Sequence, residues 1–396
     1  MSFEKTLDLS HLAHLIKEWG KALGFQDIGI CDIDLEKHEA PLQAWLDKHY
    51  YGTMSFFPER GMMRARPDEL VPGTCRIISV RMDYLPPDAS FAQHLDNTKI
   101  GYISRYALGR DYHKVMRKKL KQLGEKISEH CAGTQYRPFV DSAPILEHAV
   151  AEKAGIGFTG KHSLTINPQH GSWFFLGELF INLPLPVDKP ILADCGSCTA
   201  CMSICPTNAI VAPYTVDARK CISYLTIEHD GPIPEQYRKA MGNRIYGCDD
   251  CQLVCPFNKT APLTAEADFH ARPDLHGNSL LNLFAWSEME FLANTEGSPI
   301  RRIGYAKWQR NLITALGNIS QDNGYTQILE DKLTMLEAGQ YLEYGFNSAP
   351  SEAQQNMLIE HLTWAISQSV QPQQCPSNRQ QERLVRIVQK GLPRDA

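Results

Sequence analysis

The sequence has no hydrophobic run that is long enough to cross a membrane. Its longest strongly apolar stretches, such as Trp-Phe-Phe-Leu at 173–176, fall far short of the roughly 20 residues that span a bilayer. The N-terminal segment predicts an amphipathic helix that carries charges, which indicates neither a secretory signal peptide nor a twin-arginine export signal. We therefore expect a cytoplasmic protein with no membrane partner.

The sequence also lacks a large excess of charge of either sign. The formal net charge is −5 at pH 7, and the chain is 43% hydrophobic and 21% charged, which is typical of a soluble globular protein. This balance does not indicate nucleic-acid binding over the whole surface, although a local basic patch is compatible with it. The 396 residues predict two or three domains with their own cores, and we expect a monomer.

Cysteine, in contrast, is concentrated in one part of the chain. Eight of the 12 cysteines form the run C-x2-C-x2-C-x3-C-P from Cys195, a single Cys221, and the run C-x2-C-x3-C-P from Cys248. A four-iron cubane needs four thiolates, and the cysteine before the proline of such a run usually binds the other cluster. Crossing the ligands in this way uses all eight. Cluster one takes Cys195, Cys198, Cys201 and Cys255, and cluster two takes Cys205, Cys221, Cys248 and Cys251.

Zinc and disulfides are the alternatives for these cysteines. The two C-x2-C pairs would suit a tetrahedral zinc site, but such a site needs neither a third cysteine at the same spacing nor two Cys-Pro ends. Disulfides would need an oxidising compartment. The other cysteines are scattered, and each is expected to be a small buried hydrophobe. They are Cys31, Cys75, Cys131 and Cys375.

Hydrophobic patterns divide the chain into three parts, which predicts a multidomain α+β protein. Residues 1–185 alternate helical and extended patterns, as in one α/β domain with a mixed sheet. Residues 186–262 hold the eight clustered cysteines and begin in a proline-rich boundary. Residues 263–396 are dominated by helical patterns and predict a small helical-repeat domain.

Within these parts, individual elements are predicted from the spacing of apolar residues. The first part should contain a lysine-rich helix, a further helix from about Pro144, and a strand pair around a turn. The predicted strands are 27–33, 75–82, 136–140, 164–166 and 173–183, and the predicted helices include 111–131, 308–319 and 353–366.

The final helical pattern carries a basic stripe. Its four cations are spaced by four, three and four residues, so they share one helical face, with apolar residues towards the other. Such a stripe is expected where a helix meets a phosphate backbone, although a merely solvated face is the plainer explanation. The stripe is Arg379, Arg383, Arg386 and Lys390, and a second basic cluster is Arg301, Arg302, Lys307 and Arg310.

Two short motifs in the first part allow more than one interpretation. Residues 155–160 match G-x-G-x-x-G, but they follow a helical pattern instead of a strand, so we reject a dinucleotide site; the glycines would still let backbone approach a large cofactor. Asp141 follows a strand and precedes a helix. It is either a helix cap or a carboxylic acid facing a pocket, where desolvation would raise its pKa and keep it protonated as a general acid.

Taken together, these motifs resemble the epoxyqueuosine reductase family over essentially the whole chain. The eight cysteines alone would fit many ferredoxin-like proteins, and their combination with the motif at 140–144 is much more specific. The segments that carry the resemblance are RYALGRDYH at 105–113, VDSAP at 140–144, 155–163 leading into INP at 166–168, GSWFFLGE at 171–178 and RNLITALGN at 310–318.

The resemblance implies a cobalamin-binding α/β domain, a ferredoxin-like domain with two [4Fe-4S] clusters, and a C-terminal HEAT-like domain that binds tRNA. It implies that Asp141 is the proton donor, and Ser104 stands where some members carry cysteine, so a thiol–cobalt role is absent here. Contacts to cob(II)alamin are implied for Arg64, Ser104, Asp141, Lys161, Ser163, Thr165, Asp249 and Asp250, and tRNA contacts are expected for Arg301, Arg302, Arg379, Arg383, Arg386 and Lys390.

The implied reaction removes the epoxide oxygen of epoxyqueuosine at the tRNA wobble position. It needs two electrons and two protons, with an external donor such as flavodoxin or ferredoxin supplying the electrons through the clusters to cobalamin. Two alternatives remain, a corrinoid reductase for a small organohalide and a pure iron–sulfur electron-transfer protein. Activity on modified tRNA separates the first, and a cob(II)alamin absorption spectrum separates the second.

Overall fold

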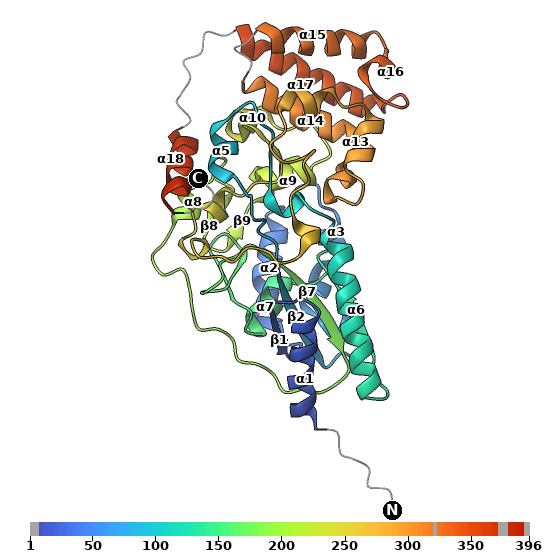
Figure 1. The fold of residues 1–396 in the computed structure, drawn as a ribbon, viewed down its shortest axis with the longest axis vertical. Coiled ribbons are helices and arrows are strands. Elements are labelled where there is room, and N and C mark those ends of the chain that lie inside the picture. Colours follow the sequence, from blue (N-terminus) through green and yellow to red (C-terminus); the bar gives the residue numbers. More distant parts are fainter. Residues whose placement is uncertain (1–7, 320–322, 371–378, 392–396) are drawn as a thin grey trace, which may run out of the picture.

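The computed structural model describes residues 8–319, 323–370 and 379–391 (Figure 1). Its centre is a four-stranded sheet in the order β1 (Asp27–Cys31), β2 (Arg76–Asp83), β7 (Phe174–Ile181) and β4 (Tyr136–Phe139). All three pairings are antiparallel, so the predicted mixed sheet is wrong in its strand directions. The prediction that apolar strands form the buried centre is confirmed for β7, since every residue of this strand is buried.

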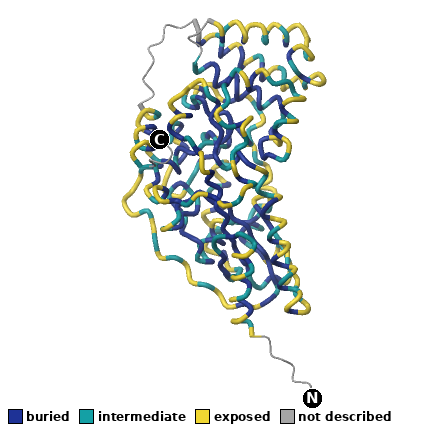
Figure 2. Tube along the Cα trace, viewed as in Figure 1, coloured by how far each residue is buried: buried dark blue, intermediate teal, exposed yellow. Residues whose placement is uncertain are grey.

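Helices cover both faces of this sheet. α1 (Leu9–Ala22) and α6 (Tyr112–His130) pack on one face, and α7 (Glu147–Lys153) packs on the other. The Asp8 carboxylate caps α1 by accepting hydrogen bonds from two backbone N–H groups at 3.0 Å, and Asp111 caps α6 by accepting one from the His113 N–H. Figure 2 shows buried residues through the middle of the molecule and exposed ones along its edges.

The predicted strand pair at 164–166 and 173–183 does not form. β6 (Thr165–Ile166) pairs instead with β5 (Phe158–Thr159), while β7 lies between β2 and β4 in the central sheet. The two-residue β6 is too short to cover an eight-residue strand, and the longer β2 matches β7 along its whole length.

The cysteine-rich segment is made of short elements fastened to the first domain. Its main helices are α8 (Ala200–Ile204), α9 (Ile222–Ile227) and α11 (Asp250–Leu253). A short strand, β10 (Arg244–Tyr246), pairs in parallel with β3 (Tyr102–Ile103), which belongs to the first part of the chain. This pairing fixes the cysteine loops against the sheet domain.

Helices alone build most of the part after the cysteines, as predicted, and a HEAT-like repeat stays a prediction. No helix of the described residues is long and apolar enough to cross a membrane. The helices that share one hydrophobic core are α12 (Leu280–Ala285), α13 (Glu288–Asn294), α14 (Gly304–Gly317), α15 (Asn323–Glu337), α16 (Tyr341–Tyr344) and α17 (Glu352–Val370).

The last helix, α18 (Arg379–Gly391), lies apart from these helices (Figure 1). It packs on α5 (Phe91–Asp96) and α11, and Leu384, Val385 and Val388 join the core of the sheet domain. The predicted grouping of 263–396 into one domain therefore differs from the structure at its end. The physical reason is the apolar face of α18, which is buried by the sheet and cysteine segments instead of by α14–α17.

Candidate functional site

The clustered cysteines gather into two sets in space. Burial, and then the neighbouring thiols of Cys195 and Cys201, raise the pKa of Cys255 to about 11. Burial, and then Cys221 and Cys205, raise the pKa of Cys251 well above its ordinary value. Apart from Cys201, which also acts on Cys251, these neighbours are the ones that the crossed assignment places together, even though Cys205 and Cys255 belong to the opposite runs of the sequence.

The two sets do not converge as ligands of single metal ions do. In the described residues, no three Cys, His, Asp or Glu side chains surround one point that would hold a metal ion. The ligands of a four-iron cubane need not converge on one point, because each thiolate binds a different iron atom. None of the described cysteines forms a disulfide; Cys31 and Cys131 are buried as expected, Cys75 is partly exposed, and Cys375 lies outside the described residues.

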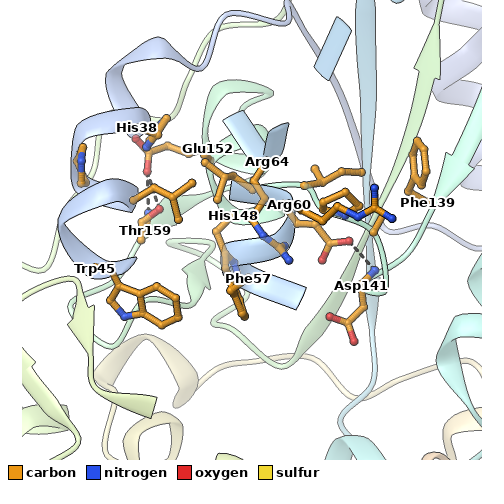
Figure 3. Close-up of a pocket in the computed structure, with 18 of the residues that line it drawn as sticks. His38, Trp45, Phe57, Arg60, Arg64, Phe139, Asp141, His148, Glu152 and Thr159 are labelled. Atoms are coloured by element: carbon orange, nitrogen blue, oxygen red, sulfur yellow. Dashed lines mark hydrogen bonds between the residues drawn. The ribbon is translucent and has the colours of Figure 1, made fainter. Parts of the chain in front are cut away.

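A cavity of about 2480 Å³ opens between the sheet domain and the cysteine segment (Figure 3). Pockets for small ligands usually measure roughly 300–1000 Å³. One wall comes from α2 (Glu39–Asp47) and α3 (Phe56–Arg60), with Trp45 and Phe57; the opposite wall comes from β4, α7 and the loop between them. The size and the aromatic lining suit one large, partly apolar ligand.

Among the predicted cofactor contacts, Arg64 lines this cavity beside the aromatic wall. Its guanidinium carbon lies 4.1 Å from the centre of the Phe57 ring, and Nη2 donates to the Phe56 carbonyl oxygen at 3.0 Å. Burial lowers the pKa of Arg64, and its Nε–H has no hydrogen-bond partner in the described structure. A buried, unpaired donor beside a cavity indicates a bound group that accepts from it.

Ser104, Asp249 and Asp250 are brought together but do not line the cavity. The Ser104 hydroxyl donates to Asp249 Oδ1 at 2.5 Å, and Tyr102 donates to Oδ2 at 2.8 Å. Asp250 forms a buried, two-pronged ion pair with Arg244 at 2.8 and 2.9 Å. These carboxylates therefore hold the turn between two cluster cysteines in place.

Lys161, Ser163 and Thr165 support neighbouring groups instead of the cavity surface. Lys161 Nζ donates to the carbonyl oxygens of Gly196 and Cys198, at 2.6 and 2.9 Å, and so fixes the loop that carries Cys195 and Cys198. Thr165 lies behind His148, with 2.8 Å between its hydroxyl and Nδ1 of that cavity residue. Ser163 adopts a left-handed conformation with φ 68° at the turn.

The glycine-rich loop serves chain packing. A Cβ at Gly157 would lie 2.5 Å from the Ile166 carbonyl oxygen, and one at Gly155 would lie 2.5 Å from that of Lys189. These two glycines therefore let backbone approach backbone, and the approach of this loop to a cofactor stays a prediction.

Asp141 lies at the junction of the sheet and the cavity, and it is not a helix cap. α7 begins six residues later at Glu147, with no side-chain capping bond. Tyr112 donates to Asp141 Oδ2 at 2.6 Å, and His113 Nε2 lies 3.1 Å from the same oxygen. Because β4 runs back along α6, the end of β4 meets the first turn of the helix. Asp141 itself has φ 57°, a left-handed conformation that few residues other than glycine adopt.

The pKa of Asp141 is shifted in the direction opposite to the prediction. Burial acts to raise the pKa of Asp141, but hydrogen bonds from His113 and Tyr112 outweigh it and the pKa is lowered. Burial opposes charge on His113 as well, yet hydrogen bonds to Asp111 and Asp141 raise its pKa to about 9. At neutral pH the proton therefore resides on His113 and Asp141 is a carboxylate, in contrast to the protonated Asp141 expected from desolvation alone.

Two carboxyl groups lie directly behind Asp141, of which Glu178 is fully buried and Glu147 half-buried. Glu147 Oε1 accepts a hydrogen bond from the Asp141 backbone N–H at 2.5 Å (Figure 3). Burial, and then Asp141, raise the pKa of Glu147 to about 7; burial and Glu147 raise that of Glu178 well above its ordinary value. The pair therefore keeps at least one proton at neutral pH, as two adjacent buried carboxyls must.

A Glu178→Gln variant is expected to change how stability depends on pH. The folded protein holds a proton on this pair up to a pH near 7, whereas the unfolded chain releases it near 4.5. Stability should therefore fall as the pH rises through this window. Glutamine removes one titrating group from the pair. Between about pH 5 and about pH 8, the thermal midpoint of the variant should therefore fall by at least about 2 °C less than that of the wild type. Identical pH dependence in both proteins would contradict a shared proton.

A second cavity, of about 280 Å³, adjoins the first at Asp141 and His113. Its walls include Tyr112 from α6, Cys221 from the cluster-two set, and Arg302. The predicted acid thus lies between the large cavity and a cysteine of the cluster segment.

The predicted basic residues are spread over different environments. Arg310 is fully buried and donates to three backbone carbonyl oxygens at 2.7 Å, and Lys307 pairs with Asp230 at 2.8 Å, so these two hold the fold. Arg302 is half-exposed, pairs with Glu228 and lines both cavities. Arg301 is exposed, as are Arg383, Arg386 and Lys390 on α18; the side chain of Arg379 lies outside the described part of the chain.

Two family models match the chain. The model described as "4Fe-4S double cluster binding domain" matches residues 194–258, which contain all eight clustered cysteines. The chain is therefore an iron–sulfur protein with two four-iron clusters. The model described as "Epoxyqueuosine reductase QueG, DUF1730" matches residues 64–142, from Arg64 past Asp141.

Similar proteins extend this likeness to nearly the full chain. The epoxyqueuosine reductase of Escherichia coli K12 is 57% identical, with 98% of this chain and 99% of the relative covered, and that of Shewanella oneidensis MR-1 is 57% identical, with 98% and 96% covered. A solved epoxyqueuosine reductase with an epoxyqueuosine-modified tRNA-Tyr stem loop is 27% identical, with a TM-score of 0.77 and 96% and 100% covered. The Bacillus subtilis enzyme, solved with its catalytic aspartate loop swung out of the active site, is 26% identical, with a TM-score of 0.79 and the same coverage. The chain belongs to the epoxyqueuosine reductase family.

Proposed function

We propose that this protein reduces epoxyqueuosine to queuosine at the wobble position of tRNA. The observation that carries the proposal is the acid group of Asp141 and His113, which lies between a cavity for a large ligand and a cysteine of the two-cluster segment. A pure electron-transfer protein has no use for a proton-donating group in such a cavity. The proposal accounts for the clusters, the cavity and the acid together.

The proposed reaction balances with two electrons and two protons. Both C–O bonds of the epoxide break, the two ring carbons become an alkene, and the oxygen leaves as water. The clusters would supply the electrons one at a time when bound, and one of the two protons must reach the oxygen as its C–O bond breaks and it becomes an alkoxide.

Cobalamin is the cofactor that we propose for the large cavity. The volume, the aromatic wall and the unpaired Arg64 Nε–H fit a large, partly apolar group with acceptor side chains. Trp45, Phe57, Arg64 and His148 would hold it, and burial lowers the pKa of His148 to about 4, so this imidazole is neutral. When bound, the corrin supplies a reduced cobalt centre, which is a strong nucleophile and reductant.

Asp141 and His113 would deliver the proton as one unit. Asp141 Oδ2 accepts the hydrogen bonds from Tyr112 and His113, and Oδ1 accepts none from the described residues, so Oδ1 is the oxygen that can face a substrate. His113 would transfer its proton to the Asp141 carboxylate, and the carboxylic acid formed in this way would protonate the alkoxide. Asp111 holds His113 through Nδ1 at 2.8 Å, and Glu147 holds the Asp141 backbone.

This arrangement predicts how turnover depends on pH. The proton on His113 is present below its pKa of about 9 and is lost as the pH rises through that value. We therefore expect kcat/KM to fall above about pH 9 in the wild type. In a His113→Asn variant the alkaline limb should move, because its donor can no longer titrate. A limb at the same pH in both proteins would remove His113 from the proton path.

The tRNA would present its anticodon loop to the smaller cavity. Loop bases can be splayed out and stacked on aromatic side chains, and Tyr106, Tyr112, Tyr224 and Tyr246 line this cavity. Arg302 lines this cavity, and it and the preceding residue, Arg301, are the proposed phosphate contacts. We further propose that the protein works in the cytoplasm, where a reducing environment suits free cysteines and iron–sulfur clusters.

Nucleoside analysis of tRNA from cells that lack this protein tests the proposed function. We expect epoxyqueuosine to accumulate, and a plasmid with the wild-type gene should restore queuosine, whereas one with Asp141→Asn should not. A normal queuosine content in the deletion strain would refute the proposal.

A further inference from the structure

The basic stripe of α18 lies beside the iron–sulfur segment. α18 packs on α11, which carries Cys251 and ends just before Cys255, and α11 packs on α8, which carries Cys201. Lys259, four residues after Cys255, reaches the other end of the helix: its Cε would lie 3.6 Å from a Cβ at Gly391. The stripe is thus attached to the elements that hold both predicted clusters.

Polar contacts also tie α18 to the turn between two cluster ligands. Gln381 Oε1 accepts a hydrogen bond from Arg244 Nη1 at 3.4 Å, and Arg244 pairs with Asp250 in the turn from Cys248 to Cys251. Gln381 also donates to the Leu95 carbonyl oxygen at the end of α5. These contacts and the buried Leu384, Val385 and Val388 give α18 a fixed place.

The outward face of α18 carries three exposed cations and one exposed carboxylate, Glu382. Arg383, Arg386 and Lys390 are exposed, and so is Lys259. Among the residues that the structure describes, no ion pair involves these four side chains. The whole chain carries a net charge of −5, so a set of unpaired cations at this position is a local feature.

The position of the stripe favours a protein partner over RNA. Figure 1 shows α18 at the left edge of the molecule and α6, whose first turn contacts Asp141, towards the right. No residue of α18 that the structure describes lines either cavity, so a wobble base that reaches Asp141 does not meet this helix. An electron donor, in contrast, must approach the clusters, and weak redox complexes use small, charge-complementary interfaces.

We infer that α18 and Lys259 form the docking surface for a small one-electron donor protein with an acidic face around its redox centre. This inference rests on the reductive function proposed above. In each encounter the donor is oxidised by one electron and one four-iron cluster is reduced by one electron, and no bond forms or breaks. The cations raise the rate of encounter and orient the donor towards the cluster helices.

The wild-type protein provides the first test. Cluster bleaching by reduced flavodoxin is followed by stopped-flow absorbance under anaerobic conditions and without tRNA, so the result does not depend on the identity of the substrate. We expect the second-order rate to fall steeply as salt is added, because opposite charges on exposed surfaces are screened. A rate that is independent of salt would contradict charge-guided docking.

Charge reversal then locates the surface. The triple variant Arg383→Glu, Arg386→Glu and Lys390→Glu should slow reduction by flavodoxin about 10-fold or more. Its reduction by dithionite should be unchanged, since that small reductant needs no docking helix. The matched control reverses three exposed lysines of α1 and α6, Lys21, Lys118 and Lys121, and should keep the wild-type rate with both reductants.

Three outcomes would overturn the inference. Flavodoxin reduction at the wild-type rate in the α18 variant would show that the stripe takes no part in docking. Equal slowing with dithionite would show that the variant damages the clusters. Weaker binding of a tRNA stem loop with an unchanged flavodoxin rate would assign the stripe to RNA instead.

Discussion

An Asp141→Asn variant is expected to lose turnover by about 10²- to 10⁴-fold while it keeps both clusters and the corrin, as expected when a general acid is removed. Asparagine keeps the size of the side chain and still accepts from Tyr112 and His113. It has no carboxylate to pass the proton from His113 to the alkoxide. Turnover is measured as queuosine formed per cluster-loaded protein, with absorption spectra reporting the cofactors.

A matched control is available on the same sheet. Asp32 follows the end of β1 as Asp141 follows the end of β4, and its carboxylate pairs with Lys153 at 2.5 Å without lining either cavity. Asp32→Asn should retain nearly full turnover. If Asp141→Asn also kept full turnover, Asp141 would not be the acid.

The second large effect concerns the crossed ligands of the two clusters. A Cys205→Ser, Cys248→Ser double variant should lose one cluster and about half of its iron, because the crossed assignment gives both cysteines to cluster two. A Cys198→Ser, Cys205→Ser double variant should lose both clusters, although its two cysteines lie in one run. Iron content and the electron paramagnetic resonance of the reduced protein measure these losses.

Cys75→Ser serves as the control for the cysteine variants, because Cys75 is partly exposed and far from the cysteine runs in sequence; it should keep all of its iron. The contrary pattern would be one cluster lost from the Cys198 and Cys205 pair and both from the Cys205 and Cys248 pair. That pattern would show that each run binds its own cluster.

The central strands were predictable because each is a short, strongly apolar segment. The pairing was not, because the apolar runs of β2 and β7 indicate burial on both faces but not strand direction. The place of α18 was equally hidden: its apolar face predicts that it packs on something, and only the tertiary structure shows that the partner is α5 and α11.

The candidate site shows the same limit. The cysteine spacing was sufficient to predict two clusters, since ligand spacing is a local property of the chain. The protonation of Asp141 was not predictable, because its partners come from a helix almost 30 residues earlier and they reverse the effect of burial. His113 and Tyr112 could have been found from the motif at 105–113. This motif ends at the start of a predicted helix, and the strand that follows the helix runs back towards that start. Glu178 is the single carboxylate in the apolar strand β7, and no role for it was predicted from the sequence.

The most direct test of the account is a single turnover with the purified, cofactor-loaded protein. An epoxyqueuosine-modified tRNA stem loop is mixed with the reduced enzyme under anaerobic conditions, and its nucleosides are analysed by mass spectrometry. The account predicts a product that is one oxygen atom lighter than epoxyqueuosine and has the mass of queuosine, in wild type but not in Asp141→Asn. Unchanged epoxyqueuosine in the presence of wild-type protein with both clusters reduced and corrin bound would contradict it.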